Sequence, residues 1–208
     1  MCGRYAIESR EENAFLKEIL EDVDRRYAGN PILSKMKTGE IFPTETVPIL
    51  ALEKGKTTPV LMNWGFPRTG SPGGVVINAR AETAMEKNMF RSSLLFRRCV
   101  VPSTGFYEWK QQDQKKKDKY LLYPPGDPML YMAGLYSLFP YGQDGQMPGF
   151  VIVTTAANTS VSPIHSRMPL VLSRHESDAW LADSAFAAQL LSRPCPAELI
   201  ASLQQVLF

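Results

Sequence analysis

The sequence predicts an α+β fold: a single domain over residues 1–208, with a curved, mainly antiparallel, barrel-like β-sheet and helices packed outside it. Short runs rich in β-branched and aromatic residues follow one another, mostly about 8–15 residues apart and separated by Gly, Pro or Asn. Few helical patterns lie between these runs, which disfavours a doubly wound parallel sheet. The chain of 208 residues is long enough to bury one good core.

The predicted strands begin with Cys2–Ile7 at the start of the chain. No internal repeat or linker divides the runs that follow, so we expect them all to belong to one domain. These further strands are predicted over Val47–Leu52, Pro59–Phe66, Val75–Asn78, Cys99–Val101, Gly105–Lys110, Lys119–Tyr123, Met129–Ser137, Gly149–Thr155 and Leu170–Leu172.

The helices are predicted from capping signals and apolar spacing. Ser9 with Glu12 forms a capping box, and apolar residues then repeat at helical spacing through Val23. Ser173 with Glu176 forms a second box, which opens a helix through Trp180. Further helices are predicted over Glu82–Leu95, Ala185–Leu191 and Ala197–Leu207.

Composition indicates an ordinary globular protein, with 44% hydrophobic and 21% charged residues. No apolar run reaches the roughly 18 residues that a spanning helix needs, and the opening MCGRYAIESREE lacks a secretory core. We therefore expect a cytoplasmic monomer with no membrane partner. The net charge of +2 neither requires nor excludes a nucleic acid, so a polyanion would have to be held by a local arginine cluster.

The three cysteines, Cys2, Cys99 and Cys195, are an odd number without paired spacing, which argues against a disulfide framework or a zinc site. Cys2 is distinctive because a small residue after Met1 allows the methionine to be removed. The mature chain would then begin with an α-amine and a thiol on adjacent carbons. Such an amine titrates at about pH 7.7–8.0, so a useful fraction is the neutral nucleophile near pH 7.4. The plain alternative is a cysteine that happens to follow Met1.

Glu108 lies in GFYEW, where strand alternation places it on the face of Phe106 and Lys110. A carboxylate in aromatic surroundings is either a solvated edge residue or a desolvated acid suited to proton transfer. The residue alone does not decide between these two interpretations.

Three other segments place a reactive or hydrogen-bonding group two residues before an arginine. Arginine is suited to phosphate because its planar guanidinium offers a fork of donors. The alternatives are that Asn78 caps a turn, that His165 is a satisfied loop histidine, and that the arginines form surface pairs. Trp64 and Trp109 add aromatic platforms. The three pairs are Cys2 with Arg4, Asn78 with Arg80, and His165 with Arg167.

Four motifs occur in the order MCGRY, INARAET, GFYEW and IHSRMP, and together they resemble the SRAP (SOS response-associated peptidase) family of abasic-site processing proteins. The resemblance runs from Cys2 to about Trp180. It implies a single curved SRAP domain and a positively charged groove for single-stranded DNA that contains abasic sites. It also implies a covalent link between Cys2 and the abasic aldehyde, and a self-processing peptidase activity that exposes Cys2. The chain ends in SLQQVLF, shorter than the usual tail of the family.

The resemblance also implies roles for particular residues. Cys2 would be the nucleophile, Asn78 a positioning group, and Glu108 and His165 acid/base residues. The expected chemistry is a thiazolidine crosslink that protects the site, with strand-cleaving lyase chemistry as a competing reaction, and it needs no metal or organic cofactor. The residues expected to contact DNA are Arg4, Arg80 and Arg167 at phosphates, and Trp64 and Trp109 near nucleotides.

Two rival functions remain open from the sequence. An N-terminal-nucleophile hydrolase would use Cys2, Asn78 and His165 to cleave an amide, with the Cys2 amine as its base. Three arginines beside the site favour a DNA groove over this hydrolase. The second rival is a non-catalytic DNA-binding module, which would bind intact and abasic strands alike and form no adduct.

Overall fold

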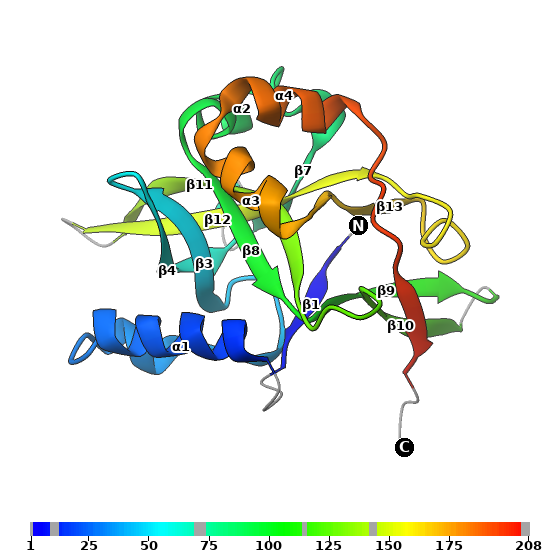
Figure 1. Ribbon diagram of the computed structural model, residues 1–208, viewed down its shortest axis with the longest axis horizontal. Helices are drawn as coiled ribbons and strands as arrows, with labels where there is room; N and C mark the ends of the chain where they lie inside the picture. Colours follow the sequence, from blue (N-terminus) through cyan, green and yellow to red (C-terminus); the bar gives the residue numbers. More distant parts are fainter. Residues whose placement is uncertain (1, 9–12, 69–73, 114–115, 142–144, 205–208) are drawn as a thin grey trace.

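The computed structural model of the chain describes residues 2–8, 13–68, 74–113, 116–141 and 145–204 (Figure 1). Its main feature is a closed ring of strands in the order β12–β4–β3–β8–β11, which closes because β12 pairs with both β4 and β11. Strands β13, β14 and β7 extend this sheet at its margins. The strand bounds are β3 (Thr46–Glu53), β4 (Lys56–Trp64), β7 (Asn78–Arg80), β8 (Arg98–Ser103), β11 (Leu130–Tyr141), β12 (Gly145–Ala156), β13 (Arg167–Pro169) and β14 (Val171–Leu172).

A second sheet has five strands in the order β15–β10–β9–β1–β2. All of its pairings are antiparallel, and in the ring only the short contacts of β12 with β4 and β7 are parallel. The expectation of a curved, mainly antiparallel, barrel-like α+β fold is therefore confirmed. The bounds are β1 (Arg4–Ile7), β2 (Gly39–Ile41), β9 (Gly105–Gln111), β10 (Lys117–Tyr123) and β15 (Ile200–Leu203), with a small separate pair, β5 (Phe66–Pro67) and β6 (Val75–Val76).

The helices lie at the periphery, with α1 on one side of the molecule and α2, α3 and α4 gathered at the opposite end (Figure 1). Helix α1 buries Leu16, Ile19 and Val23, which recur at helical spacing. No helix among the described residues is long and apolar enough to cross a bilayer. The bounds are α1 (Ala14–Arg26), η1 (Pro31–Lys35), η2 (Ala81–Thr83), α2 (Asn88–Phe96), α3 (Arg174–Ala182) and α4 (Ser184–Ser192), where η marks a 3-10 helix.

Three helix predictions need comment. The Ser173–Glu176 capping box is present, with both reciprocal hydrogen bonds. Ser9–Glu12 lies outside the described residues, and the first helix is capped by Asn13, whose side chain accepts from the Leu16 N–H at 3.0 Å. The helix predicted over Glu82–Leu95 begins only at Asn88, because Ala81–Thr83 forms a 3-10 turn.

The helix predicted over Ala197–Leu207 is wrong. Ile200–Leu203 is a strand, β15, which pairs antiparallel with the outer edge of β10. Edge pairing satisfies the backbone groups of both strands, and this tertiary gain overrides a helical preference in a short segment. Residues 205–207 lie outside the described part of the chain.

Candidate active site

Cys2 stands just before β1 and is completely buried. Its Sγ lies 3.6 Å from the Arg4 carbonyl oxygen, to which it donates. Burial raises the pKa of the Cys2 thiol well above its ordinary value, and the charge of Glu108 raises it further. The sulfur is therefore held as a neutral thiol near pH 7.

Asn78 fixes the backbone of Cys2. Its Nδ2 donates to the Cys2 carbonyl oxygen at 2.9 Å, and β7 supports it by parallel pairing of Asn78 with Ile152. Its Oδ1 is buried and accepts no hydrogen bond from the described residues. Since a buried acceptor of this kind normally has a donor, Oδ1 is a place where a bound molecule can donate. Asn78 is thus a contact between two segments rather than a turn cap.

Glu108 comes from β9, the strand that pairs with β1 and opposes Arg4 with Tyr107. Its exposed fraction is 3%, so the interpretation as a solvated edge residue is wrong. Oε1 of Glu108 lies 3.9 Å from Nδ1 of His165. A buried carboxylate beside an imidazole is a pair between which a proton can move.

His165 lies two residues before β13, in a loop that turns its ring back on its own backbone. The N–H of Arg167 donates to Nδ1 at 3.0 Å, while the Arg167 carbonyl oxygen lies 3.1 Å from the same nitrogen. When Nδ1 carries no proton, it accepts a hydrogen bond from the Arg167 N–H. When it is protonated, it can donate to the Arg167 carbonyl oxygen. This arrangement suits a ring that gains and loses a proton during a reaction.

The structure thus gathers all four predicted catalytic residues from four separate segments. Cys2 and Asn78 are joined by a hydrogen bond, Glu108 and His165 lie 3.9 Å apart, and the Glu108 charge acts on Cys2. Among the described residues no three His, Cys, Asp or Glu side chains converge as a metal site.

Arg4 lies beside this cluster in a stack of aromatic rings. Its guanidinium carbon is 4.0 Å from the centre of the Phe42 ring and 5.5 Å from that of the half-buried Trp109. Nη1 of Arg4 donates to Glu40 at 3.0 Å, and Lys119 also binds that carboxylate, at 2.7 and 2.8 Å. Arg4 and Trp109 are therefore adjacent, as a joint DNA surface requires, and Arg4 already has a carboxylate partner.

Arg167 differs from the free phosphate fork that its sequence position suggests. Both of its terminal nitrogens donate to the Glu82 carboxylate, one of them at 2.9 Å, and Nη2 also donates to the Thr154 carbonyl at 2.6 Å. The Arg167 side chain is only 17% exposed. Arg80, in contrast, is exposed.

Trp64 cannot act as an exposed platform in this structure, because its exposed fraction is 0%. Its indole N–H donates to the Ile77 carbonyl at 3.1 Å, and its ring packs edge-on against Tyr5 at 5.0 Å. Trp64 nevertheless belongs to the wall of a pocket of about 140 Å³, so its place near a nucleotide stays a prediction. Trp64 also supports β1 and the residue before Asn78 from within the core.

Four residues near the site were missed from the sequence: Glu40, Glu82, Phe42 and Lys119. Glu82 belongs to the INARAET segment, two residues after Arg80, so the spacing that identified the arginine could also have identified its neighbour. No local pattern marks the other three, because they come together only through the pairing of β2, β1, β9 and β10.

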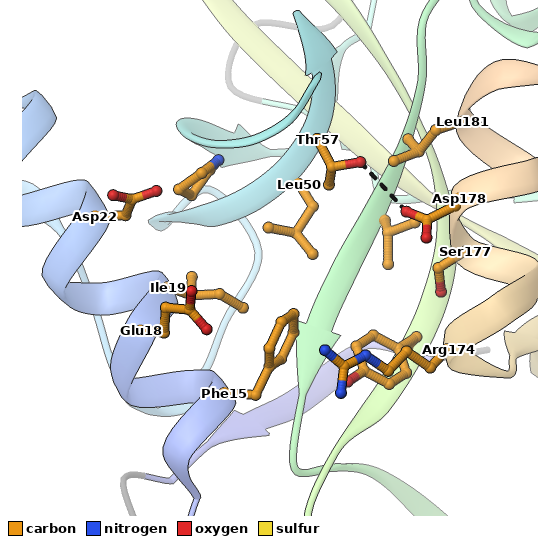
Figure 2. A pocket seen from close by; sticks show the side chains of 13 residues that line it. Phe15, Glu18, Ile19, Asp22, Leu50, Thr57, Arg174, Ser177, Asp178 and Leu181 are labelled. Carbon is orange, nitrogen blue, oxygen red and sulfur yellow. Dashed lines mark hydrogen bonds between the residues drawn. The ribbon is translucent and has the colours of Figure 1, made fainter. Parts of the chain in front are cut away.

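A separate pocket of about 220 Å³ lies between α1 and α3 (Figure 2). Ile19 and Leu50 contribute apolar surface, and the Thr57 hydroxyl reaches Asp178 at 3.4 Å. None of the nine predicted site residues lines this pocket. The candidate site is therefore the cluster around Cys2.

The fold is a closed ring of strands, and its candidate site lies at the second residue of the chain. There a buried cysteine has an amide, a carboxylate and an imidazole near it. The family model described as SOS response associated peptidase (SRAP) matches residues 1–205, and the chain belongs to this family.

Relatives of known name agree with this assignment. The chain is 31% identical to the abasic site processing protein YedK of Escherichia coli over 87% of this chain and 79% of YedK. It is 29% identical to the abasic site processing protein YoaM of Bacillus subtilis, with the same shares covered. A match to the abasic site processing protein HMCES of Xenopus tropicalis is 30% identical and covers 50% of this chain and 37% of that protein.

Solved structures share the fold. A protein of Bacteroides thetaiotaomicron superposes with a TM-score of 0.77 at 24% identity, covering 98% of this chain and 92% of its own. A phage-related protein of Bordetella bronchiseptica superposes with a TM-score of 0.71 at 26% identity, covering 99% and 95%.

Proposed function

We propose that this protein processes abasic sites in single-stranded DNA by forming a thiazolidine crosslink between its mature N-terminal Cys2 and the abasic aldehyde. The observation that carries this proposal is the position of Cys2, buried, tied to Asn78 at 2.9 Å and adjacent to the Glu108 charge. The names of the relatives support the same substrate.

The reaction has two bond-forming steps and needs no oxidant. After Met1 is released, the Cys2 amine attacks the aldehyde carbon, forming a C–N bond, and the carbonyl oxygen leaves as water to give an imine. The thiol sulfur then adds to the imine carbon, forming a C–S bond, and its proton passes to the nitrogen. The product is a five-membered ring, and the net change is the loss of one water.

The raised pKa of the Cys2 thiol sets the order of these steps. A neutral, enclosed thiol is a weak first nucleophile, whereas an N-terminal amine is partly neutral near pH 7.4. The amine therefore attacks first. Sulfur closes the ring only once the imine carbon is within its reach.

Proton transfers are assigned to Glu108 and His165. An abasic deoxyribose is mostly a closed hemiacetal, and only its open aldehyde reacts, so an acid must protonate the ring oxygen. His165 has this role here, because imidazole is the side chain that most often acts as a general acid. Glu108, adjacent to Cys2, takes the amine proton and returns it during imine and ring formation. Asn78 holds the nucleophile in place, since displacement by about 1 Å can cost 100-fold in rate.

The imine is also the intermediate from which β-elimination cleaves the strand. Ring closure competes with that lyase reaction, because the thiazolidine removes the imine on which elimination depends. We therefore expect crosslinking, which shields the site, to dominate while Cys2 is intact.

The DNA surface that we propose combines the exposed Arg80 with the Arg4–Trp109 stack. Arg80 offers an exposed guanidinium to a phosphate. Trp109 is half-buried and offers one side of its ring to a base, as aromatic side chains in single-strand sites do.

Cysteine substitutions test the covalent step. Processed protein mixed with a single-stranded abasic oligonucleotide should give an adduct whose mass is the sum of both minus one water. Cys2→Ala should abolish the thiazolidine. Cys195→Ala and Cys99→Ala should retain it, because neither residue belongs to the four site segments: Cys99 lies on β8 and Cys195 follows α4. A full yield of heat-stable thiazolidine from Cys2→Ala protein would refute the proposal.

We also propose that the site releases Met1 by its own peptidase activity, with Glu108 and Cys2 as the participating groups. Glu108→Gln distinguishes this from removal by a separate aminopeptidase, which depends on the small residue after Met1 and not on Glu108. Self-processing predicts that Glu108→Gln protein retains Met1 by mass. Complete loss of Met1 from this variant assigns the cleavage to another enzyme.

A further inference from the structure

A continuous groove runs along the chain segment that follows β2. One part of about 500 Å³ is lined mainly by polar and charged residues, which we call the polar part, and a smaller part of about 140 Å³ is mainly apolar. The two parts share Thr44, Asn63 and Met147 in their walls, so they adjoin. The apolar part includes Phe139 and Pro148.

Two exposed lysines, Lys35 and Lys37, line the polar part. They are held in place by the backbone, because the Lys37 N–H donates to the Thr46 carbonyl at 2.9 Å and Met36 forms a bridge with Thr46. The acid in the same wall, Glu45, accepts from the Phe42 N–H at 2.8 Å.

These lysines differ from the cations near Cys2 in their ion pairing. Arg4, Lys119 and Arg167 each bind a carboxylate. Among the described residues, the structure gives Lys35 and Lys37 no such partner. Two unneutralised cations on a fixed backbone favour a polyanion.

Thr44 marks where this groove meets the candidate site. Its φ of +76° lies in the left-handed region, which a β-branched residue rarely adopts. Hydrogen bonds on both sides hold it there, from the Thr44 N–H to the Trp64 carbonyl at 2.8 Å and from the Trp64 N–H to the Glu45 carbonyl at 3.0 Å. Strain that persists under such constraint is typical of functional segments.

The same segment reaches the Cys2 cluster. Tyr5 opposes Ile41 in the β1–β2 pair, and the next residue, Phe42, lies under Arg4 at 4.0 Å. Thr44 is two residues beyond Phe42, which an extended chain spans in at most about 7 Å. The groove therefore begins where the Arg4 stack ends.

We propose that this groove binds the single strand next to the abasic site, with Lys35 and Lys37 at its phosphates and the apolar part facing a base. This inference rests on the proposed function, because it extends the same DNA site. The occupant is a phosphodiester backbone rather than a free nucleotide, since the cations and the apolar surface lie in sequence along one channel.

The test compares Lys35→Ala/Lys37→Ala with a matched control, Lys17→Ala/Lys56→Ala, which removes the same charge from exposed positions outside the groove. Affinity is measured against salt for a short abasic oligonucleotide and for versions extended on one side or the other. For the extension that enters the groove, the double variant should lose about 1.4 from the magnitude of the log affinity versus log salt slope, at about 0.7 per lysine. The short oligonucleotide should bind the variant and the wild type alike.

Unchanged slopes with every oligonucleotide, or a loss equal to that of the control, would overturn this inference. An equal loss with short and extended oligonucleotides would overturn it too. Crosslinking is measured on the same samples. If Cys2 captures the abasic site while the slopes do not change, the groove inference fails and the proposed function survives; if no adduct forms with any oligonucleotide, the proposed function itself fails.

Discussion

Cys2 carries two reactive groups that the structure treats differently. The thiol is enclosed, and burial raises its pKa, while the carbonyl is held by Asn78. The amine exists only after Met1 has been released. The proposed function therefore predicts that Cys2 stays unreactive toward general thiol reagents and reacts with aldehydes once it is the first residue.

Acid/base residues and DNA-contact residues should fail in different ways. Glu108→Gln and His165→Ala, each prepared with Met1 removed so that Cys2 is the first residue, should keep nearly wild-type affinity for DNA and lose about 100- to 10,000-fold in crosslinking rate, because they act on proton transfer. Single-turnover rates at saturating protein, measured together with equilibrium binding, check this. An abasic analogue locked in its open aldehyde form should partly rescue His165→Ala.

Arg80→Ala is the matched contrast to these variants. It should weaken binding to intact and abasic strands by similar factors and reduce the salt slope by about 0.7, because one phosphate contact is lost. The rate at saturation should be retained. Loss of affinity with full rate in Glu108→Gln and His165→Ala would contradict the assigned roles and would make these residues part of the DNA groove.

The four proposed catalytic side chains lie on different elements, so the elements themselves must be held in register. Arg167, at the start of β13, and Glu82, just after β7, form a two-pronged ion pair across the end of β12. This clasp joins the segment of His165 to the segment of Asn78. Position along the chain identified both segments, but only the pairing of β7 and β13 with β12 shows that they are neighbours.

The clasp predicts a pH-dependent stability effect. The hydrogen bonds from Arg167 lower the pKa of Glu82 from its ordinary value of 4.5. A carboxyl whose pKa is depressed by folding stabilises the fold above its ordinary pKa and loses that contribution as the pH falls through the lowered pKa. Glu82→Gln should therefore reduce the free energy of unfolding at pH 7 by up to about 1 kcal/mol, a modest figure because Glu82 is 48% exposed.

Urea unfolding from pH 7 down to about pH 3 measures this effect. The difference between Glu82→Gln and the wild type should stay constant above pH 4.5 and shrink below it, as the folded wild-type carboxyl becomes neutral at its lowered pKa. Glu21→Gln, which breaks an exposed ion pair with Lys17 on α1, is the control and should show a smaller difference at pH 7. A difference for Glu82→Gln that stays constant across this range would show that the clasp does not act through charge.

At the scale of the whole molecule, local patterns predicted most strands and most helices, though not β2, β13 or β15, and the four motifs contain the four residues that cluster around Cys2. What they could not predict depends on distant pairing. Closure of the ring requires β12 to meet both β4 and β11, and β15 forms only because β10 offers an open edge. The burial of Trp64 has the same origin, since Tyr5 and Phe150 pack on it from two different sheets.

These long-range pairings place residue 2 in the interior of the fold, where β1, β7, β9 and the loop before β13 meet. Under the proposed function, the Cys2 amine in this position can react only after Met1 has been released. The products separate the proposed crosslinking protein from an amide hydrolase that uses the same Cys2, since that hydrolase would release peptide and leave abasic DNA unmodified.

The most direct test of covalent capture compares protein that retains Met1 with processed protein on the same abasic oligonucleotide, by intact mass and a denaturing gel. An amide nitrogen has no lone pair available to condense with an aldehyde, so the Met1-bearing chain should bind DNA and form no adduct. Processed protein should form an adduct equal to protein plus oligonucleotide minus one water. Equal crosslinking by both forms, with Met1 still present in the adduct, would contradict the account.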